Sequence, residues 1–310
     1  MYEKSVVLAY SINRAGRCSL FWIALLGFAV LSLAPVKQSI ADIDSLSANY
    51  AQYSAEDLFI NSGLKTLLQQ IPTSTATSFE DALSTGELPD AFNSIDPKHI
   101  RAAIRNAFKF ETFNRYLVKE LKNEMSQISR QRMLDWYETS IGERVKQAEL
   151  DNSLLFAAER FEQYRIYLAR YPASFERLKI IDKLDNTMRS TESAVDMMTN
   201  MQVAFNLSLS RFMPKDMQLS RQDIVAMVNE HQDQLLSEYR VQTREVLLFT
   251  YQDLNIDELE TLNKMLATEA GREFVEAINN GIKKGMFAAS LDLGDGLGAL
   301  INDPYSNPGI

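Results

Sequence analysis

The sequence of 310 residues predicts an all-α protein, a helical bundle built from two similar three-helix repeats with connecting helices. Three observations predict this fold class. Apolar residues recur along most of the chain at the three- and four-residue spacing of an amphipathic helix. Glycine (12) and proline (8) are scarce, whereas proteins made of strands and tight turns usually need more of both. A segment of seventeen residues also recurs later in the chain without a gap.

The first 41 residues have the layout of a secretory signal peptide. Arg14 and Arg17 contribute to a positive start, and the sixteen residues from 19 to 34 carry no charge. Small residues follow at Ser39 and Ala41, the positions that a signal peptidase reads. We therefore predict cleavage after Ala41 and export to the periplasm. The alternative is an uncleaved anchor in the inner membrane, since a tilted helix of about 17 apolar residues can span a bilayer.

Residues 42–172 are assigned to the first helical repeat. Ser54 and Asp57 form a capping-box pattern that opens a helix, which Pro72 is expected to end. The stretch 73–97 is predicted to be mainly loop. Asp96 followed by proline opens a long helix. The expected helices and helical segments of this repeat are a short candidate at 78–83, then 97–121, 129–139, a helix to about 150, and 154–171.

Residues 173–290 are assigned to the second helical repeat. Helices are expected from Ser174 to Met188 and then through the methionine-rich segment that ends near Pro214. Two further capping boxes, at 220–223 and 255–258, open a long helix to about 249 and the helix after it. Because residues 291–310 are rich in glycine, asparagine and proline, we predict that they form a flexible tail.

The internal repeat is the sharpest feature of the sequence. Residues 133–149 align with residues 262–278 at an offset of 129. Three positions are identical in the two segments, and they pair Thr139 with Thr268, Gly142 with Gly271, and Ala148 with Ala277. Amphipathic helices resemble one another, so chance similarity is the alternative interpretation. The repeat predicts two copies of a three-helix unit.

The shared Thr-x-x-Gly motif predicts a helix elbow in each copy. The hydroxyl groups of Thr139 and Thr268 can accept a hydrogen bond from a free N–H at the start of the next helix. Gly142 and Gly271 would then lie in its first turn, where glycine costs about 1 kcal/mol relative to alanine. Such a glycine is expected where neighbouring atoms approach closely. The alternative is functional, with an anion or a peptide terminus held at the open N–H groups.

At this motif the sequence resembles domain of unknown function family 2059, which consists of bacterial exported helical proteins with a Ser-Pro-x-Gly step between two helices. Here residues 139–142 and 268–271 stand at that step, and Trp136 and Tyr137 precede it in the first copy. Both copies lack the proline, and the second has Met265 in place of an aromatic residue. The resemblance covers about 40 residues per copy, and it implies an all-α envelope protein and no catalytic residues.

Composition and motifs exclude several other functions. The formal charge of −9 argues against broad nucleic-acid binding, which needs a positive surface. The two histidines, His99 and His231, have no second ligand at metal-binding spacing, and the chain has one cysteine. The glycines at 294, 296 and 298 follow no strand and open no phosphate-binding unit. We therefore predict no catalytic residue, no metal and no cofactor.

The most economical function is a non-enzymatic binding or scaffold protein of the cell envelope. Its partner would be an unknown envelope protein or a hydrophobic ligand, held in a groove between the repeats that Trp136, Tyr137 and Met265 would line. Membrane contact is expected only through the leader, if it is not cleaved. Two alternatives are an envelope hydrolase that uses helix-borne carboxylates and a carrier of lipids or other hydrophobic ligands.

Overall fold

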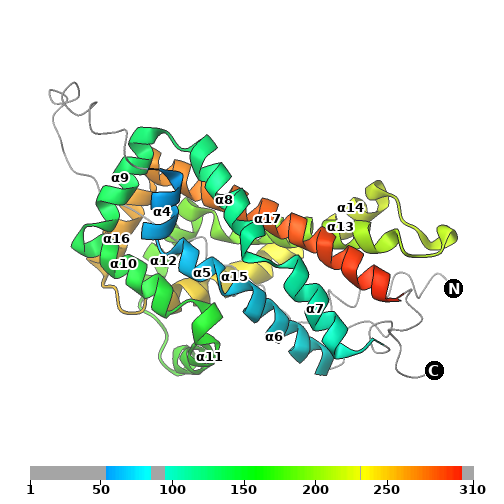
Figure 1. The fold of residues 1–310 in the computed structure, drawn as a ribbon. Helices are drawn as coiled ribbons and strands as arrows, with labels where there is room; N and C mark the ends of the chain where they lie inside the picture. Colours follow the sequence, from blue (N-terminus) through cyan, green and yellow to red (C-terminus); the bar gives the residue numbers. More distant parts are fainter. Residues whose placement is uncertain (1–53, 85–94, 231, 302–310) are drawn as a thin grey trace.

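The computed structural model describes residues 54–84, 95–230 and 232–301 (Figure 1). Over these ranges the regular elements are helices, and no strand is present. The predicted all-α class is therefore confirmed. The leader at 1–41 and the last nine residues of the predicted tail lie outside the described residues.

Fourteen α-helices and one short 3₁₀ helix follow one another in the described ranges. The first group is α4 (Ala55–Asn61), α5 (Leu64–Leu68), α6 (Ile71–Ser84), α7 (Pro97–Ala107) and α8 (Phe110–Glu124). The second is α9 (Gln127–Tyr137), α10 (Ser140–Asp151), α11 (Leu154–Arg170), α12 (Phe175–Met188) and α13 (Ser190–Ser210). The last is η4 (Lys215–Met217), α14 (Arg221–Asn229), α15 (Gln232–Thr250), α16 (Ile256–Leu266) and α17 (Glu269–Ile301).

The helix starts that the sequence predicts from capping residues are confirmed. Ser54, Ser220 and Asn255 each accept a hydrogen bond from the backbone N–H three residues ahead, and in each case the acidic residue there bonds back to the cap. Asp96 caps α7 by accepting from the Lys98 N–H at 2.8 Å. Local side-chain chemistry thus accounts for these four boundaries without any tertiary contact.

Three helices differ from the sequence prediction. Pro72 lies in the first turn of α6 and does not end a helix, because a proline there removes no intrahelical hydrogen bond. Residues 73–84 are consequently helical, not loop. The expected long helix from Pro97 breaks at Phe108, whose backbone angles are φ −91° and ψ 48° and whose ring is buried. Residues 220–249 likewise form two helices, α14 and α15.

The prediction of a flexible tail from Leu291 is wrong for residues 291–301, which continue α17 to Ile301. Leu293 and Leu297 are buried in the core. A β-carbon at Gly294 would lie 2.9 Å from the carbonyl oxygen of Phe205 on α13. Gly294 therefore allows α17 to pack closely against α13. The glycine content that suggested a flexible tail is explained by this packing.

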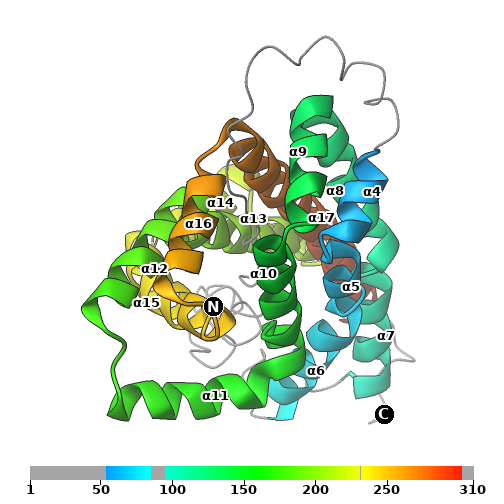
Figure 2. The ribbon, with the colours of Figure 1, turned by 90° about the vertical axis from the view of Figure 1, so that its left-hand side faces the viewer.

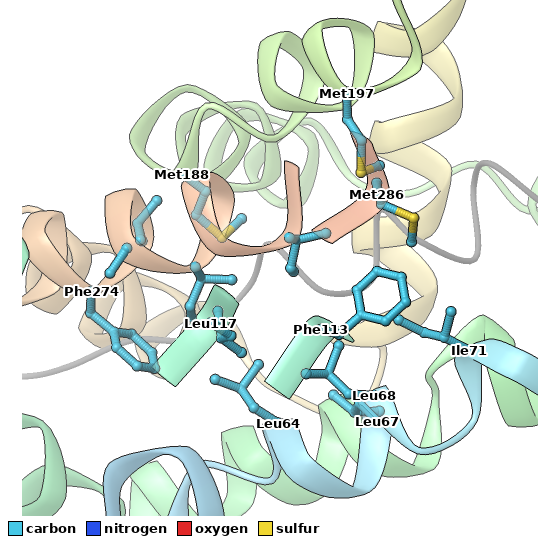
Figure 3. Packing of buried hydrophobic residues seen from close by; sticks show 14 of the residues in the cluster. Leu64, Leu67, Leu68, Ile71, Phe113, Leu117, Met188, Met197, Phe274 and Met286 are labelled. Atoms are coloured by element: carbon cyan, nitrogen blue, oxygen red, sulfur yellow. The ribbon is translucent and has the colours of Figure 1, made fainter. Parts of the chain in front are cut away.

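Helix α17 lies at the centre of the molecule. It packs most extensively against α13 and α8, and also against α7, α9 and α16 (Figures 1 and 2). Figure 3 shows Phe113 and Leu117 of α8 between α17 and the leucines of α5. Gly281 and Gly285 of α17 face these two side chains, so the axes of α8 and α17 can approach closely.

Many methionines of the described ranges belong to this core. Met133, Met188, Met197, Met265 and Met286 are buried in the main hydrophobic cluster. Methionine suits such a place because its flexible side chain fills irregular gaps between helices. Within the described ranges, no helix combines the length and the apolar character needed to cross a bilayer.

Candidate functional site

The two Thr-x-x-Gly motifs form elbows with the same hydrogen bonds. The N–H of Gly142 donates to Thr139 Oγ1 at 3.1 Å, and the N–H of Gly271 donates to Thr268 Oγ1 at 3.1 Å. Each threonine hydroxyl also donates to the carbonyl oxygen three residues earlier, at 2.7 Å. The predicted capping role of both threonines is therefore present in the structure.

Both elbow glycines stand where a side chain does not fit. A β-carbon at Gly142 would overlap the carbonyl oxygen of Trp136, and one at Gly271 would overlap the carbonyl oxygen of Met265. The obstacle in each case is backbone, which cannot move aside as the end of a flexible side chain can. The glycines thus permit the sharp change of direction between α9 and α10 and between α16 and α17.

Removing the capping hydroxyl should weaken each elbow by a similar amount. We expect Thr139→Ala and Thr268→Ala each to lower the free energy of unfolding by about 1 kcal/mol, because one backbone N–H loses its partner. Denaturant unfolding would measure this. Thr→Ser at the same positions keeps the hydroxyl and should cost less, so equal losses for serine and alanine would contradict the capping role.

The prediction that Trp136, Tyr137 and Met265 line an open groove is wrong. Trp136, Tyr137 and Met265 are each 3% exposed and belong to the main core. The ring of Tyr137 packs edge-on against Trp136 and against Phe274 of α17, with centroids 5.1 and 6.3 Å apart. Helical periodicity identified an apolar face correctly, but α17 covers that face. These side chains therefore hold the two elbows together and line no open surface.

Each elbow joins two helices into a hairpin, α9 with α10 and α16 with α17. The second helix of each hairpin contacts the start of the other hairpin. Glu273 on α17 accepts a hydrogen bond from the N–H of Ser126, the N-cap of α9, at 2.9 Å. Arg144 on α10 pairs with Glu258 in the first turn of α16 and donates to the carbonyl oxygen of Asp253 at 3.1 Å. Arg144 and Glu273 are equivalent at the offset of 129. The two hairpins thus exchange contacts at matching positions.

A buried carboxyl group lies beside the first elbow. Glu149 on α10 is buried, and Tyr251 donates a hydrogen bond to its Oε1 at 2.8 Å. Its Oε2 and the hydroxyl of Tyr137 have no hydrogen-bond partner in the described part of the chain. Burial raises the pKa of Glu149 well above its ordinary value of 4.5, although the Tyr251 bond opposes the shift. Burial therefore favours the protonated form of this side chain and keeps it away from the surface.

This carboxyl group should make stability depend on pH. Because its pKa is raised in the folded state, the folded protein keeps a proton that the unfolded chain releases above about pH 4.5. The contribution of Glu149 to stability is therefore full below that pH and falls as pH rises toward the folded pKa. We expect Glu149→Gln to lose this decline, and unfolding curves from pH 5 to 8 would measure it. Parallel pH dependences of the two proteins would contradict the assignment.

A pair of interacting carboxyl groups, Glu120 and Glu124, lies on α8. Glu120 is buried, which disfavours its charge, but Lys284 at 2.7 Å and a bond with Glu124 lower its pKa overall. Burial raises the pKa of Glu124, and Glu120 raises it further, against the effect of the Asn280 side chain at 3.0 Å. The pKa values of the pair are thus pushed in opposite directions, as in sites that divide acid and base roles.

Four of the exposed large apolar residues in the described ranges lie between the end of α11 and the start of α12. Ile166, Tyr167, Tyr171 and Phe175 are 60, 54, 62 and 81% exposed, and we call these four residues the aromatic corner. Tyr167 and Tyr171 pack against each other with ring centroids 5.1 Å apart. Figure 2 shows α11 at the edge of the molecule, between α10 and α12.

Sequence reasoning missed the aromatic corner although a signal was present. Tyrosines stand at positions 164, 167 and 171, which share one side of a helix, and Phe175 follows soon after the proline at 172. Of these three tyrosines, Tyr164 is half-buried, and its hydroxyl donates to the carbonyl oxygen of Leu248 at 3.1 Å.

The chain was also compared with known proteins. The comparisons with protein families, with curated proteins and with solved structures gave no match. The interpretation of this chain therefore rests on its own sequence and geometry. The aromatic corner and the two elbows are the features from which a function can be argued.

Proposed function

We propose that the chain is an exported, all-helical, non-enzymatic binding protein of the cell envelope that holds a protein partner at the aromatic corner. The observation that carries this proposal is the exposure of four large apolar side chains within ten residues, 166–175. Exposed apolar patches on a surface mark interaction sites, and the close sequence spacing of these four residues favours a single patch. Tyrosine and other aromatic anchors also supply much of the binding energy in protein interfaces.

The aromatic corner is held in place by polar contacts on its inner side. Arg165 bonds to Glu245 on α15 at 2.9 Å. Arg177, two residues after Phe175, donates to the carbonyl oxygens of Tyr251 and Leu254 at 2.6 and 2.9 Å. These bonds tie α11 to α15, and the start of α12 to the segment between α15 and α16. A surface fixed in advance loses less entropy on binding, which favours a binding role.

We also propose that two copies of one helical unit form the scaffold behind the corner. Helices α9 and α16 have the same length and begin and end at positions 129 residues apart. Helices α10 and α17 begin at the same offset, after identical threonine caps. The exchange of contacts by Arg144 and Glu273 is the pattern expected when two equivalent units pack about a twofold axis. We also propose that each copy of this unit resembles the helical step of domain of unknown function family 2059.

Export is supported by the leader sequence at 1–41, with its positive start, uncharged run and small residues at the cleavage position. N-terminal sequencing of the protein recovered from the periplasm tests it. A mature chain that begins after Ala41 is expected. A chain that keeps its original start and fractionates with the inner membrane would show the uncleaved anchor instead.

The binding role is tested by removing the aromatic corner. We expect a Tyr167→Ser, Tyr171→Ser, Phe175→Ser variant to fold as the wild type does, because exposed positions change stability by about 0.5 kcal/mol or less each. It should lose a stoichiometric partner that co-purifies with the wild type. The matched control replaces two apolar residues of similar exposure elsewhere, Ile128→Ser and Val241→Ser, and should keep the partner.

Two results would contradict the role of the corner in binding another protein. One is co-purification of the same partner with both the corner variant and its control. The other is a wild type that forms a dimer in size-exclusion chromatography while the corner variant is monomeric. The second result would make the corner a contact between two copies of this chain.

A hydrolase acting on the envelope is the second candidate, and the pair Glu120 and Glu124 is the observation that favours it. Their pKa values are shifted in opposite directions, as an acid and a base require. However, the two groups interact directly on one helix, whereas glycosidases place them on either side of a cleft. Loss of a cell-wall-degrading activity in Glu124→Gln, with unchanged folding, would move this candidate to first place.

A further inference from the structure

A polar cavity of about 230 Å³ lies between α17 and the junction of α12 with α13, beside the second elbow. Five of its lining residues are charged: Arg189, Asp196, Arg272, Glu276 and Lys283. The volume is below the roughly 300–1,000 Å³ typical of pockets for drug-sized ligands. A lipid chain would therefore not fit, whereas a small metabolite would.

The charged groups of the cavity come from two helices in regular positions. Arg189 and Asp196 are two helical turns apart at the start of α13. Arg272, Glu276 and Lys283 share one side of α17 through spacings of four and seven residues. Each helix thus presents groups of both signs to the same cavity.

In the part of the chain that the structure describes, the charged side chains of this cavity are not joined in direct ion pairs. Within the described ranges, none of the five side chains takes part in an ion pair; Arg272 instead donates to the carbonyl oxygen of Ala267 at 2.5 Å. Asp196 and Lys283 are half-buried, whereas Arg189, Arg272 and Glu276 are exposed. Half-buried charges lose part of their hydration, so a ligand that pairs with them is favoured.

Arg189 stands in a backbone conformation that suits glycine. It is the one residue other than glycine with a positive φ, 52°, among the described residues. Buried bonds hold this junction: Asp185 accepts from the N–H and the hydroxyl of Thr191 at 2.9 and 2.7 Å, and Asn279 donates to the carbonyl oxygen of Met188 at 3.3 Å. The side chain of an arginine at this strained position lines the cavity.

We propose that this cavity binds a small zwitterion, an amino acid or a dipeptide. The guanidinium of Arg189 and the ammonium of Lys283 would pair with its carboxylate, and the carboxylates of Asp196 and Glu276 with its ammonium group. A simple anion would leave the lining carboxylates unpaired, and a simple cation would leave the lining cations unpaired. The site is independent of the aromatic corner, so either proposal can fail alone.

Isothermal titration of the purified chain tests this proposal. Glutamate, glycine and glycylglycine are the zwitterionic probes, while inorganic phosphate and putrescine carry charge of one sign only. We expect saturable binding of at least one zwitterion below a concentration on the order of 10 mM and none of phosphate or putrescine. Comparison of the amino acids with glycylglycine identifies which source of the zwitterion fits.

The variant Arg189→Gly separates binding from folding. Glycine relieves the positive φ, so the melting temperature should rise or stay the same, while binding should weaken by roughly tenfold or more. Asp196→Asn should weaken binding as well, and the exposed control Lys215→Gln should not. No saturable heat with any zwitterion, binding of phosphate that Asp196→Asn leaves unchanged, or full affinity in Arg189→Gly would each overturn the proposal.

Discussion

Gly281→Ala is expected to lower the free energy of unfolding by about 3 kcal/mol, at the upper end of the usual cost of overpacking a core. A β-carbon at Gly281 would lie 2.8 Å from the Cα atom of Leu117 and 2.7 Å from its Cδ1. The first of these atoms is backbone, so α8 and α17 would have to separate. That separation would disturb the contact of Phe113 with Gly285 one turn along the same interface.

The matched control for Gly281→Ala is on the same helix. A β-carbon at Gly296 would meet the β-carbon of Ala103 at 3.4 Å, which is ordinary van der Waals contact. Gly296→Ala should therefore raise the free energy of unfolding by about 0.5–1 kcal/mol through the better helix propensity of alanine. Denaturant unfolding of both variants checks the pair. Similar changes in the two proteins would contradict the close packing of α8 against α17.

Gly142→Ala and Gly271→Ala should each destabilise the fold by roughly 3 kcal/mol or more. At both positions the added methyl group overlaps a backbone carbonyl oxygen of the preceding helix. Relief requires opening the elbow, which would break the hydrogen bond from the glycine N–H to Thr139 or Thr268. The cost thus includes the loss of the cap as well as the steric overlap.

The two elbow variants together examine the equivalence of the hairpins. If the elbows are copies of one unit, the losses in denaturant midpoint should be alike for Gly142→Ala and Gly271→Ala. A large loss at one elbow and none at the other would contradict that equivalence. The double variant should lose about the sum, provided that the two sites act independently.

The sequence was informative where one residue determines the local structure. Serine, aspartate, asparagine and threonine caps predicted six helix starts, including those after Thr139 and Thr268, because a cap needs only neighbouring atoms. The same local reasoning failed at Pro72 and at the tail. Proline is compatible with a first turn as well as with an end, and Gly294 and Gly298 serve contacts with α13 and the residues after it, which no local signal shows.

The surface could be predicted less well than the helices. Periodicity shows that a helix has an apolar side, but it does not show whether another helix covers that side. Tyr137 is buried against Phe274 of α17, whereas Tyr167 and Tyr171, which are also aromatic, are exposed at the end of α11. The polar cavity also depends on two helices that are distant in the sequence, and Arg189 owes its place to a backbone angle that composition cannot reveal.

The most direct test of the binding role is site-specific photo-crosslinking in cells that express the exported chain. A photoreactive phenylalanine analogue would replace Phe175 in the aromatic corner, and a second protein would carry it at the exposed control position Val241. The account predicts an adduct with one other protein from position 175 and none from position 241. No adduct, equal adducts from both positions, or an adduct between two copies of this chain would contradict it.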